Sequence, residues 1–275
     1  MKAVIPAAGF GTRFLPATKA QPKEMLPVYD KPTLQHLVEE AVSAGIDDIL
    51  IITGRNKHSI EDHFDKSYEL EYSLNRAGKD RDLKKIRKIT DLADICYVRQ
   101  KNLNGLGDAI KCSERHVGDE AFAVLLGHTI TQNHTRQLMD AYNKYHTSIV
   151  SLKKVSPDDT NRHKIISTDS VEDNTYQIQE IINNPVGNPP SNLAVMGRYI
   201  LTPEIFEKID ETENRAGEIH LSDALAKLSC LYGVVCEGKS HYIENRLDWL
   251  KASIDFALED DEFRDDLVEY MKNYI

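Results

Sequence analysis

Residues 2–27 read KAVIPAAGFGTRFLPATKAQPKEMLP, and this stretch decides the fold. Residues 2–7 are mostly apolar, which predicts a buried strand. Gly9 and Gly11 follow at once. A strand that runs directly into a glycine-rich loop is where α/β proteins hold phosphates, because glycines let backbone N–H groups approach the oxygens. A tight turn without a ligand is the alternative.

Two cations favour the phosphate interpretation. Arg13 and Lys23 follow the glycines in a chain whose net charge is −10. A dinucleotide-binding fingerprint requires a third glycine at position 14, which is Phe14, so an NAD-dependent protein is disfavoured. A P-loop requires Gly-Lys-Ser/Thr, whereas the sequence reads Gly11-Thr12-Arg13. The loop therefore predicts a phosphate site of a different class.

The remaining pattern predicts an α/β fold. Short apolar runs alternate with helical patterns, and this alternation is typical of a parallel, doubly wound sheet. The β-rich middle, residues 148–201, predicts added and partly antiparallel strands, and therefore a mixed sheet. Strands are predicted at 2–7, 48–53, 95–99 and 122–126, and helices at 34–43, 58–64, 107–115, 134–145, 203–209, 221–231 and 246–257.

Composition excludes several classes of partner. A net charge of −10 argues against sequence-independent binding of nucleic acid. No apolar run approaches the ~20 residues of a membrane helix, so no membrane partner is expected. The four cysteines form no CxxC pair and no zinc-finger spacing, and the first residues lack a signal-peptide core. These features predict a cytoplasmic protein.

The glycine loop carries a resemblance to a known family. Gly9-Phe10-Gly11-Thr12-Arg13, with Pro16 and Pro22-Lys23, resembles the G-x-G-T-R…P-K signature of sugar-phosphate nucleotidyltransferases. Residues 15–27 are similar to bacterial and archaeal UTP–glucose-1-phosphate uridylyltransferases in particular, and further matches continue to about residue 258.

The resemblance implies a fold, a reaction and an assembly. The fold would be a Rossmann-like doubly wound mixed sheet of the nucleotide-diphospho-sugar transferase type, formed by residues 1–275 as a single domain. The reaction would join UTP and glucose 1-phosphate into UDP-glucose and pyrophosphate. A homo-oligomer is implied, and the C-terminal helical region 246–275 is the candidate interface.

The resemblance also implies roles for individual residues. Arg13 and Lys23 would be the catalytic cations. Gln100 would bind uracil, since an amide offers both a donor and an acceptor. The other nucleotide-binding positions would be Ala8, Gly9, Gly11, Thr12 and Gly105. The sugar phosphate would contact Lys164, Asn183, Asn184 and Gly197, and a divalent metal, Mg²⁺ by resemblance, would lie at Asp223 and His128.

Several positions depart from the family pattern, all on the sugar and metal side. His128 stands where the family carries a metal-binding Asp, and magnesium prefers oxygen ligands whereas imidazole suits softer ions. Asn183-Asn184-Pro185 replaces Glu-Lys-Pro, His163-Lys164 replaces Tyr-Gly, and Tyr242-Ile243-Glu244 replaces Asp-x-Gly.

Three interpretations of these departures stay open. The first is an active uridylyltransferase in which Lys164 replaces the lost lysine. The second is a uridylyltransferase with a changed sugar or metal preference. The third is a catalytically impaired paralogue that binds uridine nucleotides or regulates, and that pairs with an active relative.

Overall fold

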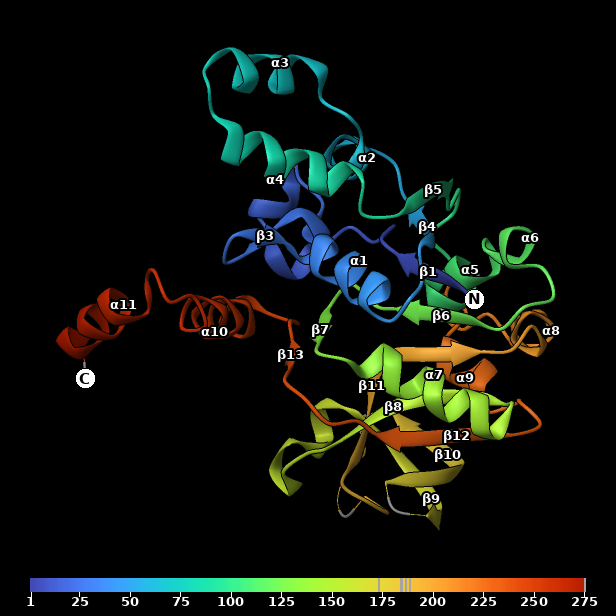
Figure 1. Ribbon diagram of the computed structural model, residues 1–275. Helices are drawn as coiled ribbons and strands as arrows, with labels where there is room; N and C mark the ends of the chain where they lie inside the picture. Colours follow the sequence, from blue (N-terminus) through green and yellow to red (C-terminus); the bar gives the residue numbers. More distant parts are fainter. Residues whose placement is uncertain (173, 184, 186, 188, 275) are drawn as a thin grey trace.

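The computed structural model describes residues 1–172, 174–183, 185, 187 and 189–274. A nine-stranded mixed sheet runs through this part of the chain in the order β5-β4-β1-β6-β11-β8-β12-β10-β9 (Figure 1). Its strands are β1 (Lys2–Pro6), β4 (Asp48–Thr53), β5 (Asp94–Arg99), β6 (Phe122–Leu125), β8 (Ser148–Lys154), β9 (Lys164–Glu172), β10 (Thr175–Asn183), β11 (Leu193–Leu201) and β12 (Leu231–Val235). Two short sheets pair β2 (Pro27–Val28) with β3 (Lys31–Pro32), and β7 (Thr129–Thr131) with β13 (Ser240–Tyr242).

The first half of the sheet is parallel and doubly wound, as the alternating pattern predicts. Strand β1 lies between β4 and β6, both parallel to it, and its Val4 and Ile5 are fully buried. Successive side chains of a strand point to opposite faces, and these two residues belong to different hydrophobic clusters. Helices α1 (Thr33–Ser43) and α7 (His134–Tyr145) cover one face, and α5 (Gly105–Lys111), α8 (Glu204–Asp210) and α9 (Leu221–Leu225) cover the other.

The second half of the sheet is mixed, which confirms the predicted class. Strand β11 is antiparallel to both β6 and β8, and all nine of its residues are buried. Strand β12 runs parallel to β8 and antiparallel to β10.

Two predicted helices have the wrong extent. The helix expected over 221–231 ends at Leu225, and Leu231–Val235 forms β12 instead. The local sequence there, with Tyr232, Val234 and Val235, favours a strand once β8 and β10 offer hydrogen-bonding edges. The helix expected over 107–115 is divided into α5 and α6 (Glu114–Val117).

The polar stretch after β4 forms a helical insertion. Helices α2 (His58–Phe64), α3 (Tyr68–Arg76) and α4 (Asp80–Thr90) occupy it, and Figure 1 shows α3 and α4 projecting away from the sheet. Leu83 is the buried residue of α4 and most of its other side chains are partly or fully exposed, so the charges of this stretch form a solvated surface.

The C-terminal segment leaves the sheet. After β13, helices α10 (Arg246–Ala257) and α11 (Arg264–Met271) extend to one side, with α10 packed near β2 and β13 (Figure 1). Short 3-10 turns are η1 (Thr12–Phe14), η2 (Ala17–Lys19), η3 (Lys23–Met25), η4 (Pro157–Arg162) and η5 (Lys272–Tyr274). In the described part of the chain, no helix has the length and apolar character that crossing a membrane requires.

Candidate functional site

The glycine loop emerges from the carboxyl end of β1. Gly11 adopts a positive φ of 67°, and a Cβ there would lie 2.9 Å from the Cβ of Lys23. Thr18 donates a hydrogen bond to the Gly11 carbonyl oxygen at 2.7 Å. The position therefore requires glycine, and the loop wraps closely around the stem of Lys23.

A buried ion pair fixes the other side of the loop. The Lys57 ammonium donates to the Gly9 carbonyl oxygen at 2.7 Å and to Glu24 Oε2 at 2.8 Å. Glu24 is 0% exposed. Neither partner was assigned a role from the sequence, although Glu24 lies within residues 15–27, which carry the family resemblance. The pair neutralises Lys57, so the positive charge left for a ligand in this loop is that of Arg13 and Lys23.

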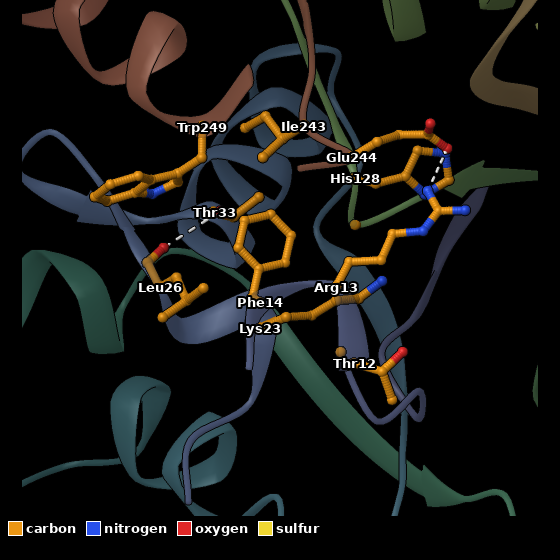
Figure 2. Close-up of a pocket in the computed structure, with 12 residues that line it drawn as sticks. Thr12, Arg13, Phe14, Lys23, Leu26, Thr33, His128, Ile243, Glu244 and Trp249 are labelled. Carbon is orange, nitrogen blue, oxygen red and sulfur yellow. Dashed lines mark hydrogen bonds and ion pairs between the residues drawn. The ribbon is translucent and has the colours of Figure 1, made fainter. Parts of the chain in front are cut away.

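Two adjoining pockets meet at the loop. The larger, of about 470 Å³, extends from Ala8 to Gln100 and Gly105, and the smaller, of about 320 Å³, extends from Arg13 to Trp249 (Figure 2). Both are lined by Gly11, Thr12, Lys23, Gly127 and His128. The structure thus brings together all the residues predicted to bind the nucleotide, Ala8, Gly9, Gly11, Thr12, Gln100 and Gly105, around the larger pocket.

Gln100 lies at the far end of the larger pocket, directly after β5. Its side chain is only 5% exposed, and its amide nitrogen donates to the Gly105 carbonyl oxygen at 3.2 Å and to Asp108 Oδ2 at 2.6 Å. Gly105 has a φ of 93°, and a Cβ there would lie 2.8 Å from the Ile219 carbonyl oxygen. The backbone thus packs too tightly here for a side chain.

His128 separates the two pockets and contacts an aromatic ring. Its imidazole meets Tyr242 edge to face with ring centroids 5.1 Å apart, and His163 lies 5.2 Å from the same Tyr242 ring. Burial and then nearby positive charge lower the pKa of His128 to about 3, so the imidazole is neutral at physiological pH. Those charges belong to Lys23, Arg198, Lys164 and Arg13.

Arg13 is held by a carboxylate from the C-terminal segment. Its guanidinium lies 2.8 Å from Glu244 Oε1 and remains 66% exposed (Figure 2). The hydrogen bond that Arg13 donates to Glu244, and then the negative charge of Glu244, raise the pKa of Arg13. The Ile243 N–H donates to the His128 carbonyl oxygen at 2.7 Å, which brings Glu244 over the loop. Sequence reasoning gave no partner for Arg13, because the partner lies 231 positions away.

The other predicted ligands that the structure describes do not line these two pockets. Lys164 begins β9 and pairs with Asn183 of β10 in the strand register, and Asp223 lies 3.4 Å from Arg215. A Cβ on Gly197 would lie 2.8 Å from Thr129 Oγ1, so its glycine is required by packing. Neither pocket is lined by Lys164, Asn183, Gly197 or Asp223, and Asn184 lies outside the described residues.

The donor set does not fit Mg²⁺ held by protein side chains alone. Within the described ranges, no group of three or more His, Cys, Asp or Glu side chains could hold a metal ion. His128 is surrounded by positive charge and packs against Tyr242, while Asp223 is paired with Arg215. Magnesium requires oxygen ligands in near-octahedral geometry, which these partners do not offer.

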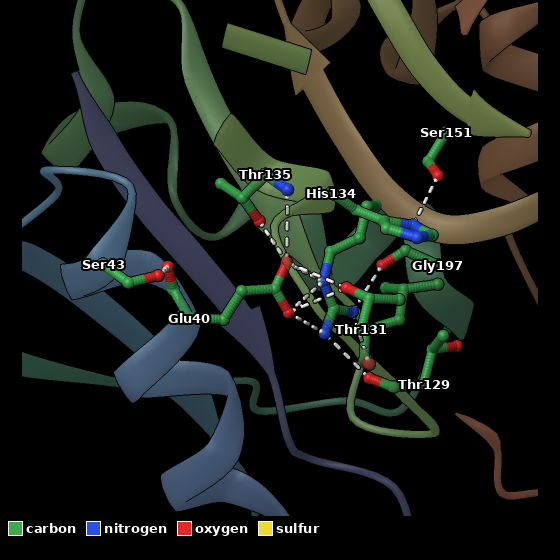
Figure 3. Close-up of polar contacts among 10 residues, drawn as sticks. Glu40, Ser43, Thr129, Thr131, His134, Thr135, Ser151 and Gly197 are labelled. Atoms are coloured by element: carbon green, nitrogen blue, oxygen red, sulfur yellow. Dashed lines mark hydrogen bonds and ion pairs between the residues drawn. The ribbon is translucent and has the colours of Figure 1, made fainter. Parts of the chain in front are cut away.

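A buried charge cluster supports the turn that carries His128 (Figure 3). Arg198 on β11 is 1% exposed, and its Nη2 lies 2.8 Å from Glu40 Oε2 on α1. The same guanidinium donates to the carbonyl oxygens of Leu126 at 3.3 Å and Thr129 at 2.8 Å, on either side of His128. Thr131 and Thr135 donate to the Glu40 carboxylate as well.

The charge state of Glu40 follows from this cluster. Burial by itself would raise the pKa of Glu40, but the positive charge of Arg198 and the hydrogen bonds from Arg198, Thr135 and Thr131 outweigh it and lower that pKa. Glu40 is therefore an ionised, fully partnered carboxylate in the core.

Comparison with known proteins identifies relatives over nearly the whole chain. The family model described as "Nucleotidyl transferase" matches residues 2–235. The UTP–glucose-1-phosphate uridylyltransferase of Bacillus subtilis (strain 168) is 49% identical over 100% of this chain and 97% of that relative. A UTP-bound UGPase from Acinetobacter baumannii superimposes with a TM-score of 0.91 at 33% identity, covering 98% of both chains. A UDP-glucose pyrophosphorylase complexed with UDP-glucose superimposes with a TM-score of 0.84 at 40% identity, covering 94% of this chain and 99% of that chain.

The fold and the glycine-loop site define a nucleotidyl transferase. Within that class, the full-length matches place the chain in the family of the UTP–glucose-1-phosphate uridylyltransferases.

The Arg13–Glu244 pair leads to a prediction for anion binding. Glu244→Gln keeps the side-chain shape but removes the competing charge, so we expect inorganic triphosphate to bind roughly threefold to fivefold more tightly, the range that an exposed ion pair allows. Titration calorimetry measures the change. Arg13→Ala should weaken binding, and Glu244→Gln should have no further effect in that background. An equal gain with or without Arg13 would contradict this role.

The Glu40 cluster leads to a prediction for stability. Glu40→Gln leaves Arg198 buried without its counter-charge, and we expect the free energy of unfolding in urea to fall by about 3–5 kcal/mol. Thr131→Val removes one hydrogen bond to the same carboxylate and should cost roughly 1 kcal/mol. Glu211→Gln, which breaks the exposed pair with Lys208, is the surface control and should change little. Equal losses for Glu40→Gln and Glu211→Gln would refute a central role.

Proposed function

We propose that this chain transfers a uridylyl group from UTP to glucose 1-phosphate, giving UDP-glucose and pyrophosphate. One observation carries the proposal: a pocket of about 470 Å³ unites the glycine loop, Lys23, Gln100 and Gly105 from three separate parts of the sequence. The names of the full-length relatives support it. UTP and sugar phosphates are cytosolic metabolites, so we place the proposed reaction in the cytoplasm.

The base would be bound at the far end of the larger pocket. With both amide hydrogens of Gln100 donated to Gly105 and Asp108, its Oε1 remains as an acceptor for the N3–H of uracil. Gly105 packs tightly against Ile219 and lines the same pocket, so the base would lie against its backbone. The amides of residues 9–12 then face the triphosphate.

The chemistry would be an in-line displacement. A phosphate oxygen of glucose 1-phosphate attacks the α-phosphorus of UTP, the new P–O bond forms as the bond from the α-phosphorus to the bridging oxygen breaks, and pyrophosphate leaves. Negative charge spreads over the phosphoryl oxygens, and positioned cations stabilise it. Lys23 lines both pockets and would therefore contact the reacting phosphoryl group, while Arg13, released from Glu244, would bind the sugar phosphate or the leaving group.

We infer that the protein supplies most of the positive charge itself. Because the residues near His128 do not fit Mg²⁺, no step of the proposed reaction is assigned to a protein-held metal. Lys164 is a further cation in this region: burial lowers its pKa, and the charge of Asp223 opposes that shift. Its proximity to His128 supports the sugar-phosphate role assigned to it from the sequence.

A pyrophosphate-release assay tests the proposed reaction. UTP, glucose 1-phosphate and each of Mg²⁺, Mn²⁺, Co²⁺ and Zn²⁺ are supplied in turn. We expect pyrophosphate release that depends on both substrates, and a loss of ~10²–10³ in rate for Lys23→Ala, because a preorganised stabiliser is removed. Lys19→Ala, a nearby exposed lysine that lines neither pocket, is the matched control. Absence of turnover with every metal would reject catalysis.

A second candidate function has a specific observation in its favour. His128 and Tyr242 occupy two positions at which the resembled family carries carboxylates, and their rings pack against each other. Mg²⁺ prefers oxygen ligands, and these two rings offer it no carboxylate, so the chain would bind uridine nucleotides as a non-catalytic or regulatory paralogue of an active enzyme. This candidate predicts UTP binding without turnover.

Metal dependence separates the two candidates. We expect the affinity for UTP to change by less than about threefold when Mg²⁺ is replaced by EDTA, because the donor set offers Mg²⁺ few oxygens. In His128→Asp/Tyr242→Asp, two carboxylates replace rings whose centroids are 5.1 Å apart, and UTP binding should become dependent on Mg²⁺. Turnover gained by this variant alone would favour the paralogue. Wild-type UTP binding that is abolished by EDTA would contradict the inference that protein side chains supply most of the positive charge.

We also propose self-association through the C-terminal helical region. Leu247 and Leu250 of α10, and Val268 and Tyr270 of α11, are large apolar side chains exposed to solvent. Light scattering on the intact chain measures the molar mass. A molar mass equal to that of one chain at high protein concentration would refute this proposal.

A further inference from the structure

We propose that Asp108 is a positioning residue that fixes the orientation of the Gln100 amide and thereby selects uracil over cytosine. This inference rests on the proposed function, because it concerns the base of the nucleotide bound in the larger pocket. It assigns the discrimination between the two pyrimidines to a residue that does not itself line that pocket.

The geometry determines which way the amide of Gln100 points. Asp108 lies in the first turn of α5, and its Oδ2 is 2.6 Å from the terminal amide of Gln100. An ionised carboxylate only accepts hydrogen bonds, so the atom facing it is the amide nitrogen. The Gly105 carbonyl oxygen, at 3.2 Å, accepts the second amide hydrogen. Both neighbours therefore demand the same orientation.

The opposite orientation is strongly disfavoured. A half-turn of the Gln100 amide would bring its Oε1 against the Asp108 carboxylate and the Gly105 carbonyl, so two hydrogen bonds would become two contacts between acceptors. Gln100 is 5% exposed, so water cannot easily compensate for these losses. The backbone is fixed as well, because the Gln100 N–H donates to the Thr53 carbonyl oxygen at 2.9 Å.

The fixed orientation presents one kind of atom to a ligand. Among the described residues, no group donates to Gln100 Oε1, and Gln100 lines the larger pocket. The side chain therefore offers an acceptor. Uracil and thymine carry a donor at N3, whereas cytosine carries a lone pair at N3. The acceptor matches the first two bases and repels the third.

A purely structural role for Asp108 makes a different prediction. An acidic residue in the first turn of a helix stabilises that helix through its dipole, whichever base is bound. Removing such a charge would destabilise α5 and weaken the binding of all nucleotides to the same extent. If Asp108 instead positions Gln100, its removal should change the ratio of UTP to CTP affinity, because the hydrogen bond lost by uracil becomes available to cytosine.

Calorimetric titration of the full chain with UTP, CTP and dTTP separates these roles. Asp108→Asn is isosteric, and its amide can donate to Gln100 Oε1 and so permit the half-turn. We expect the ratio of UTP to CTP affinity to fall by about tenfold in Asp108→Asn, because the turned amide would donate to N3 of cytosine instead of accepting from N3–H of uracil. The affinity for dTTP should change as that for UTP does, because thymine carries the same N3–H. Asp108→Ala removes one of the two acceptors that fix the amide, leaves the Gly105 carbonyl, and should lower the ratio in the same direction.

The matched control is Glu114→Gln, another change from carboxylate to amide, on the neighbouring helix α6. Glu114 pairs with Lys111 at 3.0 Å and lines neither pocket, so this variant should keep the wild-type ratio. An unchanged ratio in both Asp108 variants, or an equal loss for UTP and CTP, would overturn the inference while leaving the proposed function intact. Absence of UTP binding by the wild type would overturn the proposed function itself.

Discussion

The carboxylate of Glu40 is the constraint on which both pockets depend. It is buried in α1 and accepts hydrogen bonds from Arg198, Thr131 and Thr135, which belong to three other elements. A charge in the core is tolerated only when every lone pair is used, and here the partners come from residues that are 91 to 158 positions away. Because Arg198 also binds the carbonyl oxygens of Leu126 and Thr129, on either side of His128, the same cluster fixes the turn that borders both pockets.

The local electrostatics follow from how each cation of the loop is partnered. Lys57 is neutralised by the buried Glu24, and its hydrogen bond to the Gly9 carbonyl oxygen fixes the backbone of the loop. Arg13 is paired with Glu244 near the surface, so an incoming anion can compete with Glu244 for the Arg13 guanidinium. Lys23 is 3.9 Å from its nearest carboxylate, Glu24, and borders both pockets. An acidic chain can thus contain a small cationic site, and the net charge of the chain does not predict such a site.

The sequence predicted what is local and missed what is long-range. The bounds of β4, α2, α7 and α10 agree with the predicted ranges, because apolar periodicity over 6 to 12 residues determines them. Strand β12 was missed because its neighbours β8 and β10 supply the hydrogen bonds that favour it. The glycine loop and Gln100 were found through motifs, whereas the pairs Arg198–Glu40 and Arg13–Glu244 join residues too distant for any local pattern.

The two ends of the site have separate supports, and this separates binding from turnover. The base end rests on the start of α5, where the Gly107 N–H donates to the Ile219 carbonyl oxygen at 2.9 Å and the Ile219 N–H donates to the Asn104 carbonyl oxygen at 2.7 Å. The other end rests on the C-terminal segment, through the Ile243–His128 backbone hydrogen bond and the His128–Tyr242 ring contact. No residue of the first support belongs to the second. In the proposed reaction, the contacts at Gln100 are therefore independent of the residues around His128, and metal and sugar chemistry could change without a change of base.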